Sequence, residues 1–174
     1  VARVIALLSE LCEGTPATSI NRWCASSMQA IMSASDAIRA GQRQCIVAGG
    51  VESMTRVPMD EGNSYTALHP DLSEQYNLFE LPMGMTAEKV AREYDVPREA
   101  QDEYALRSHE RAADATDSGR FSDEVVSVET PDGTVSEDEG IRRDTSMEAL
   151  AGLPTVFDSE GTVTPGNASQ ISDG

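Results

Sequence analysis

The stretch NRWCASSMQAIMSASDAIRAGQRQCIVAGG, residues 21–50, decides the fold class of this chain. Residues 26–40 predict a helix that Gly41 ends, because their apolar side chains repeat at helical spacing. A β-prone run precedes this helix at 17–21, and a second one follows it at 44–48. A strand, a helix and a strand in this order build a largely parallel sheet, so we expect an α/β fold.

Cys24 stands at the start of the predicted helix. The positive end of the helix macrodipole and the unpaired backbone N–H groups there favour a thiolate, which can attack a carbonyl carbon. A buried cysteine without a chemical role fits the same position, because free cysteines are often buried. Local chemistry leaves both interpretations of Cys24 open. Cys12 and Cys45 lie in apolar segments, and we expect them to be buried and inert.

The chain is strongly acidic. It has 30 Asp and Glu against 13 Lys and Arg, a net charge of −17, and Lys89 is its one lysine. Nucleic acid is excluded as a partner, because phosphate binding needs clustered positive charge. An acidic, lysine-poor surface favours adaptation to concentrated salt, which screens the repulsion among carboxylates. An ordinary acidic enzyme is the alternative.

Cysteine and histidine are few. Three cysteines without CxxC spacing and two histidines predict neither a disulfide framework nor a metal site. They favour a reducing compartment, and we expect the cytoplasm. The apolar runs are too short to cross a bilayer, so we expect no membrane partner. His109 falls in mid-helix on a face that we expect to be exposed, and His69 lies in a loop, so neither suits acid–base catalysis.

The rest of the chain predicts mostly helices. A helix is expected at 2–11, and two more follow a long irregular loop at 55–81. Thr86 is the expected cap of the first of these two, and the second runs from Pro97 to Gly119. The shorter elements are a strand at 124–129 and a helix that begins from the capping box TSME at 145–148.

Five motifs, in order, resemble those of the thiolase family. Residues 21–54 resemble its nucleophile segment, with Asn-x-x-Cys-x-Ser, Arg-Ala-Gly and Ala-Gly-Gly-x-Glu-Ser-Met. PMGMTAEKVA at 82–91 resembles its Met-Gly-x-Thr-Ala-Glu motif, and residues 98–128 resemble its loop-domain helix and the strand that follows. DEGIRRDTSMEAL at 138–150 and GTVTPGNASQISDG at 161–174 resemble two further signatures. Five ordered motifs are far more specific than a lone cysteine motif.

This resemblance implies roles for four residues. Cys24 resembles the nucleophile that the acyl-CoA substrate acylates, with backbone N–H groups stabilising the thioester oxygen. Met83 resembles a methionine that lines the pantetheine and acyl pocket. Arg142 resembles an arginine near the nucleotide end of CoA, and Ser169 resembles a serine that contacts the pantetheine. A solvated arginine and a turn-forming serine are the alternatives. Coenzyme A is then a substrate, and neither a cofactor nor a metal is implied.

The resemblance also implies an architecture. The fold would be a layered, thiolase-like α/β fold, of which this chain holds part of the N-terminal half and an inserted, mainly helical loop domain. Residues 1–54 would form the incomplete core and 55–160 the loop domain with an oligomerisation loop, while 161–174 would return to the core and be truncated. A homo-oligomer, either dimer or tetramer, is implied for the complete protein.

The implied reaction is thiolytic cleavage of a 3-ketoacyl-CoA by CoA, or the reverse Claisen condensation, through a cysteine acyl-enzyme. Pro82 stands where some short-chain thiolases carry a histidine, which favours varied 3-ketoacyl chains. The family's catalytic histidine and second cysteine would fall beyond residue 174, so we expect the chain alone to be inactive. A non-catalytic module that binds CoA or a partner is the alternative. A ketoacyl synthase is disfavoured by the motifs at 82–91 and 161–174.

Overall fold

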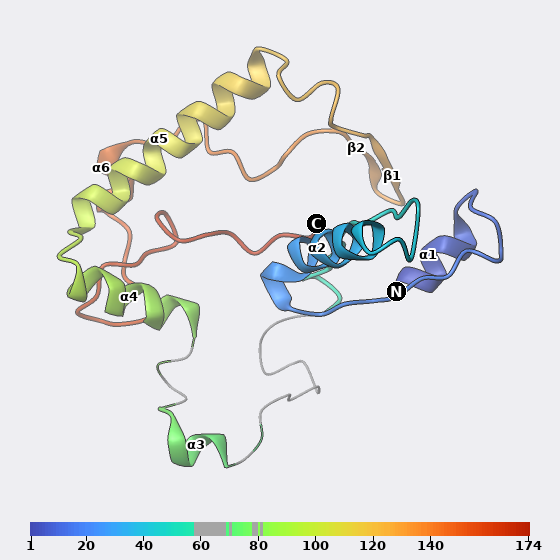
Figure 1. Ribbon diagram of the computed structural model, residues 1–174. Helices are drawn as coiled ribbons and strands as arrows, with labels where there is room; N and C mark the ends of the chain where they lie inside the picture. Colours follow the sequence, from blue (N-terminus) through green and yellow to red (C-terminus); the bar gives the residue numbers. More distant parts are fainter. Residues whose placement is uncertain (58–68, 70, 78–79, 81) are drawn as a thin grey trace. The chain divides into compact units, whose positions relative to one another are not determined.

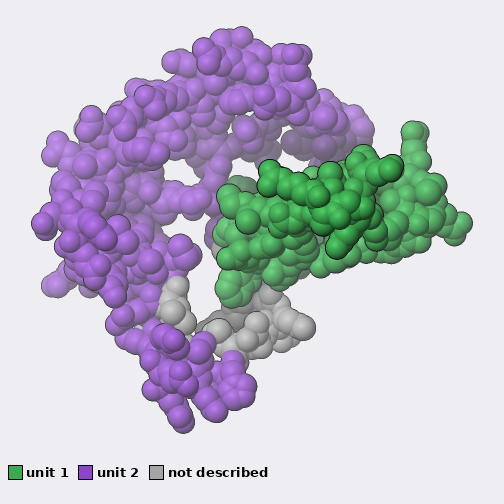
Figure 2. All heavy atoms as spheres, in the orientation of Figure 1, with its two compact units in different colours: residues 1–64, 172–174 green, residues 65–171 purple. Residues whose placement is uncertain are grey.

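The computed structural model describes residues 1–57, 69, 71–77, 80 and 82–174 (Figure 1). The helices are α1 (Ala2–Leu8), the 3-10 turn η1 (Trp23–Ala25), α2 (Ser26–Arg39), α3 (Leu72–Gln75), α4 (Met83–Glu93), α5 (Arg98–Asp117) and α6 (Met147–Ala151), and the strands are β1 (Val128–Thr130) and β2 (Gly133–Val135). Contacts divide the chain into unit 1, residues 1–64 and 172–174, and unit 2, residues 65–171 (Figure 2). The predicted three-part division at 54 and 160 stays a prediction.

Unit 1 contains the helix that the sequence predicted. Helix α2 spans Ser26–Arg39, and Gly41 ends it in the left-handed region at φ 71°, where glycine meets no steric penalty. The helix predicted at 2–11 is shorter, because Ser9 is extended and its hydroxyl donates to the carbonyl oxygen of Ala6 (3.0 Å). Among the described residues, no helix is long and apolar enough to cross a membrane.

The strands predicted at 17–21 and 44–48 are wrong for this chain. Both segments are irregular, because none of the described residues offers them a neighbouring strand, and a strand requires a partner for its backbone N–H and C=O groups. A backbone hydrogen bond does join Glu52 and Gly174, because the Gly174 N–H donates to the Glu52 carbonyl oxygen (2.9 Å). Asp173 adds a carboxylate oxygen 2.8 Å from the Thr55 nitrogen. These contacts attach the last three residues to unit 1.

The apolar face of α2 lies open to solvent. Met28 and Ile31 are 66% and 58% exposed, and Ala6 is the buried hydrophobic residue of unit 1 among those described. The apolar periodicity that predicted α2 is therefore correct, although the described residues do not cover it.

Unit 2 is built on α4 and α5, which a short turn joins. Asp95 is left-handed in this turn (φ 53°), and the Val96 N–H closes it on the Ala91 carbonyl oxygen (2.9 Å). Helix α4 begins at Met83, three residues before the expected cap, so the prediction that Thr86 caps it is wrong. Pro82 precedes the helix because its fixed φ suits a helix start. Most of the predicted loop at 55–81 lies outside the described residues.

The later elements of unit 2 are a hairpin and a short helix. Strands β1 and β2 pair antiparallel, with Val128 opposite Val135, so the strand predicted at 124–129 forms only at its end. Helix α6 packs on α5. Ser146 caps α6 by accepting a hydrogen bond from the Ala149 N–H (3.2 Å), one residue after the predicted Thr145. The buried apolar side chains of unit 2 among the described residues are Ala91, Leu150 and Val163.

Candidate functional site

Cys24 lies in a turn whose shape is set by two polar neighbours. The side-chain oxygen of Asn21 accepts a hydrogen bond from the Trp23 N–H (3.0 Å). The hydroxyl of Ser26 accepts one from the Arg22 N–H (2.8 Å) and donates to the Trp23 carbonyl oxygen (2.6 Å). Trp23 is held at φ 47°, a left-handed conformation that is uncommon for a bulky residue. The motif residues on either side of Cys24 therefore fix the backbone that carries it.

The thiol of Cys24 is exposed immediately before α2. This helix begins without a side-chain cap or an acidic residue in its first turn, while a backbone N–H at its start donates to the Trp23 carbonyl oxygen. Gly50 lies close to the same helix start, because a Cβ there would come within 2.1 Å of the Ser27 hydroxyl oxygen. The backbone that follows the segment 44–48 thus passes directly beside the first turn of α2.

Cys12 and Cys45 are also exposed, so the prediction that they are buried is wrong. Cys45 lies in the unpaired segment that was expected to be a strand. Cys12 lies in a turn, with its sulfur 3.1 Å from the Thr15 hydroxyl oxygen. That hydroxyl, followed by the backbone N–H of Gly14, lowers the pKa of Cys12 below its usual value.

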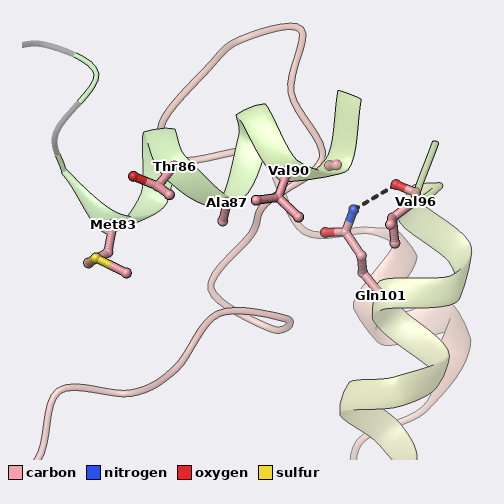
Figure 3. A pocket seen from close by; sticks show the side chains of 7 residues that line it. Met83, Thr86, Ala87, Val90, Val96 and Gln101 are labelled. Carbon is pink, nitrogen blue, oxygen red and sulfur yellow. Dashed lines mark hydrogen bonds between the residues drawn. The ribbon is translucent and has the colours of Figure 1, made fainter. Parts of the chain in front are cut away.

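Met83 lines an apolar groove of about 370 Å³ along α4 (Figure 3). The side chain is 79% exposed and lies at one end of the groove. At the other end the side-chain amide of Gln101 donates to the Val96 carbonyl oxygen (3.1 Å), next to Val90. Thr86, Ala87 and Ala91 supply the remaining wall. An open groove with this lining suits an extended, mostly apolar ligand.

Glu88 is a buried residue that supports the candidate site and that the sequence patterns did not single out. Its side chain points inward from α4 and is 1% exposed. Its carboxylate accepts hydrogen bonds from the backbone N–H groups of Thr162 (2.9 Å) and Val163 (2.8 Å). Gly161 allows this approach, because a Cβ there would lie 2.2 Å from a Glu88 oxygen. The Met-Gly-x-Thr-Ala-Glu motif therefore holds the start of the Gly-Thr-Val-Thr segment. In the sequence, Glu88 shares a helix face with Gly84 and Ala91, but that spacing does not distinguish a buried glutamate from a solvated one.

Asp102 holds the same segment from α5. This carboxylate, also 1% exposed, pairs with the Arg98 Nε (2.7 Å) and accepts a hydrogen bond from the Asn167 side-chain nitrogen (2.9 Å). The Asn167 side-chain oxygen accepts in turn from the Thr164 N–H (2.8 Å). Charged groups are rarely buried unless they are paired in this way. The backbone just before Ser169 is therefore fixed by two buried carboxylates on two helices.

Arg142 and Arg143 are adjacent but differ in their contacts. Arg143 forms an ion pair with Asp117 of α5 (2.7 Å). Within the described part of the chain, the Arg142 guanidinium has neither a hydrogen-bond nor an ion-pair partner, while its backbone N–H donates to the Nδ1 of His109 (3.2 Å). Arg142 is exposed and His109 is half-buried, so the prediction that His109 lies on an exposed face is wrong. The sequence analysis also missed the contact itself, because it joins residues 33 positions apart.

The segments of Arg142 and Ser169 meet in unit 2. A Cβ at Gly140 would lie 2.2 Å from the Gln170 side-chain nitrogen, so the two segments are in direct contact. Ser169 is exposed, and its hydroxyl donates to the Gln170 carbonyl oxygen (3.3 Å). Met83, Arg142 and Ser169 all belong to unit 2, whereas Cys24 belongs to unit 1. The structure therefore brings the Arg142 and Ser169 segments together within unit 2, while Cys24 belongs to unit 1.

Comparisons with known proteins agree with these motifs. The family model of the thiolase N-terminal domain matches residues 1–174. The 3-ketoacyl-CoA thiolases of Erwinia tasmaniensis and Pectobacterium carotovorum are 44% and 43% identical, each covering 100% of this chain and 46% of the relative's length. The chain thus spans about half the length of the curated relatives that it matches.

Solved structures support the fold. The dimeric peroxisomal thiolase of Saccharomyces cerevisiae aligns with a TM-score of 0.87 at 34% identity, covering 98% of this chain and 44% of the yeast chain. Human mitochondrial 3-ketoacyl-CoA thiolase aligns with a TM-score of 0.82 at 35% identity, covering 99% and 47%. The predicted thiolase-like α/β fold class is confirmed. A family model that matches every residue, together with these relatives, shows that the chain belongs to the thiolase family.

Proposed function

We propose that this chain is the acyl-carrying part of a thiolase-type acyltransferase, with Cys24 as its nucleophile. One observation carries the proposal: an exposed thiol stands in a turn that Asn21 and Ser26 hold at the uncapped start of α2. A helix start stabilises a thiolate, and an accessible thiolate is the form that attacks a carbonyl. The family membership agrees with this chemistry.

In the proposed cleavage, the Cys24 sulfur attacks the 3-keto carbon of a 3-ketoacyl-CoA. The bond between carbons 2 and 3 then breaks, its electron pair leaves with the acetyl-CoA enolate, and a proton converts that enolate into acetyl-CoA. The acyl group remains on sulfur as a thioester. The sulfur of a second CoA attacks this thioester and takes over the acyl group. The products are an acyl-CoA with a shorter chain than the substrate and the restored Cys24 thiol. The reverse sequence is the Claisen condensation.

Coenzyme A is the proposed ligand of unit 2. Support comes from Arg142, which is exposed and without a side-chain partner among the described residues, and which could pair with a phosphate of CoA. Ser169 follows a segment that buried carboxylates hold in place, and Met83 lines an apolar groove. Arg142 suits the phosphates of CoA, whereas Ser169 and the groove at Met83 suit its pantetheine arm. The proposal needs no metal or separate cofactor.

Three wider properties are also proposed. We infer a cytoplasmic protein of fatty acid metabolism, in agreement with three free thiols and with relatives named 3-ketoacyl-CoA thiolases. A homo-oligomer is supported by the yeast relative, which is described as dimeric, and by the open apolar face of α2. Salt adaptation is supported by the net charge of −17.

The test is acylation of the 174-residue chain by acetyl-CoA, followed by intact mass measurement and peptide mapping. We expect one acetyl group, located on Cys24 and absent from Cys24→Ala. Cys45→Ala is the matched control, because it removes another exposed thiol outside the Asn21–Ser26 turn. Acetylation that survives Cys24→Ala would refute the nucleophile assignment. We expect no steady-state cleavage of acetoacetyl-CoA, because turnover needs a further acid or base.

The second candidate function is a non-catalytic module that binds CoA. The observation in its favour is that Met83, Arg142 and Ser169 lie in unit 2, apart from the proposed nucleophile in sequence and in unit. Calorimetric titration with CoA separates the two functions. Binding to wild type and Cys24→Ala alike, without any acetylation of Cys24, would favour the module over the acyltransferase.

A further inference from the structure

The imidazole of His109 connects helix α5 to the loop that carries Arg142. Its Nδ1 lies 3.2 Å from the Arg142 backbone nitrogen and accepts the hydrogen bond from that N–H. An accepting Nδ1 requires a neutral ring whose proton is on Nε2. The bond spans 33 positions of sequence, so it fixes where the Arg142 backbone lies on α5.

Two other contacts hold the same loop. Arg143 pairs with Asp117, two turns along α5 from His109, and Gly140 lies against Gln170 beside Ser169. With its neighbours attached to the fold, the Arg142 guanidinium is left without a hydrogen-bond or ion-pair partner in the part of the chain that the structure describes. The loop is therefore anchored by its backbone and by Arg143, while one cationic group remains available.

The charge of unit 2 makes the position of that cation important. Residues 65–171 contain 23 acidic and 8 basic side chains, a net charge of −15. An anionic ligand is repelled by such a surface unless a guanidinium is held where the ligand arrives. Holding the Arg142 backbone before binding also lowers the entropy that the loop loses when it engages a ligand.

We infer that His109 is a positioning residue for coenzyme A: it holds the Arg142 backbone so that the adjacent guanidinium meets a CoA phosphate. The inference rests on the proposed binding of CoA to unit 2. His109 acts through Arg142 and takes no part in the acyl transfer.

The experiment is a calorimetric titration of the full chain with CoA. His109→Leu removes the acceptor, and we expect about three- to tenfold weaker binding, the value of one hydrogen bond. His109→Asn restores an acceptor near the position of Nδ1, and we expect affinity close to wild type. In an Arg142→Ala background, His109→Leu should cause no further loss, because the hydrogen bond at His109 acts on CoA only through the guanidinium that Arg142→Ala removes. His69→Leu, at the other histidine, is the matched control and should leave the affinity unchanged.

Hydrogen–deuterium exchange gives a second readout that does not depend on CoA. The Arg142 amide should exchange faster in His109→Leu than in wild type and His109→Asn, while the buried Val163 amide stays protected. Unchanged exchange at Arg142, or unchanged CoA affinity in His109→Leu when Arg142→Ala weakens binding, overturns the inference and leaves the proposed function standing. A wild-type chain that does not bind CoA refutes the proposed CoA site, and the role of His109 with it.

Discussion

Unit 1 and unit 2 differ in the contacts that hold their elements together. In unit 2, Glu88 and Asp102 are 1% exposed and hold a returning segment by hydrogen bonds from two helices. In unit 1, α2 is regular, but its apolar residues Met28 and Ile31 remain mostly exposed. Unit 2 closes on itself through contacts between residues more than 60 positions apart. Local propensity can therefore form a helix without a core, whereas a buried charge requires the distant partner to be present.

The units also differ in charge. Unit 2 has a net charge of −15, while the 7 acidic and 5 basic side chains of unit 1 give −2. The excess of acidic over basic side chains thus lies almost entirely in unit 2, which contains the buried carboxylates. Four measurements can break or sharpen this comparison.

Glu88→Ala should give the largest effect. It leaves the buried N–H groups of Thr162 and Val163 without their acceptor, which costs about 3 kcal/mol in the free energy of unfolding. Met28→Ala in unit 1 is the control, and because Met28 is exposed we expect a change within about 0.5 kcal/mol. Urea titration followed by far-ultraviolet circular dichroism measures both. Equal losses would show that the two units do not differ as described.

Gly161→Ala should come next. The new Cβ would meet the Glu88 carboxylate at 2.2 Å, so unfolding should become easier by about 1–3 kcal/mol. Gly14→Ala in unit 1 is the control, since nothing lies within 4 Å of its Cβ position. We expect that change to be neutral or slightly stabilising through the unfolded chain. The same urea titration applies, and a neutral Gly161→Ala would contradict the close approach to Glu88.

Salt should stabilise unit 2 more than unit 1. Concentrated KCl screens the repulsion among carboxylates, so the thermal midpoint of the chain should rise by several degrees from dilute buffer to molar salt. Hydrogen exchange at increasing salt should show added protection in α4 and α5 before α2. A midpoint that is flat or falls would reject salt adaptation and leave an ordinary acidic protein.

The smallest expected effect concerns the cysteines of unit 1. The position of Cys24 at a helix start, taken alone, predicts that iodoacetamide modifies it before Cys12 and Cys45. Because the Thr15 hydroxyl and then the Gly14 backbone lower the pKa of Cys12, more of this thiol is thiolate at a given pH, and Cys12 becomes a competitor.

We therefore expect the alkylation rate of Cys12 to reach its plateau at lower pH than in Thr15→Val, which removes the hydroxyl. Peptide mapping of partly labelled protein separates Cys12 from Cys24. A pH profile of Cys12 that Thr15→Val leaves unchanged would rule out this hydrogen bond as the cause.

Sequence patterns predicted the helices well where the signal was local. The apolar spacing of α2 and the stop at Gly41 were correct, as was the helix that begins after Pro97. The strands predicted at 17–21 and 44–48 did not form. A strand requires a neighbouring strand, and the local sequence does not show whether one is present. The cap of α4 was also misassigned, since Pro82 starts the helix before Thr86.

The residues of the chain determined by themselves which family it belongs to and which four side chains are candidates for its site. Ordered motifs carry that information, because each is a local pattern of residue types. Only the tertiary structure decided that Glu88 holds Val163 and that His109 holds Arg142. Those contacts join residues 75 and 33 positions apart, and no local periodicity distinguishes a buried glutamate or an accepting imidazole from a solvated one. The physical reason is that burial and hydrogen bonding belong to pairs of groups, and the pairs exist only once the helices have packed.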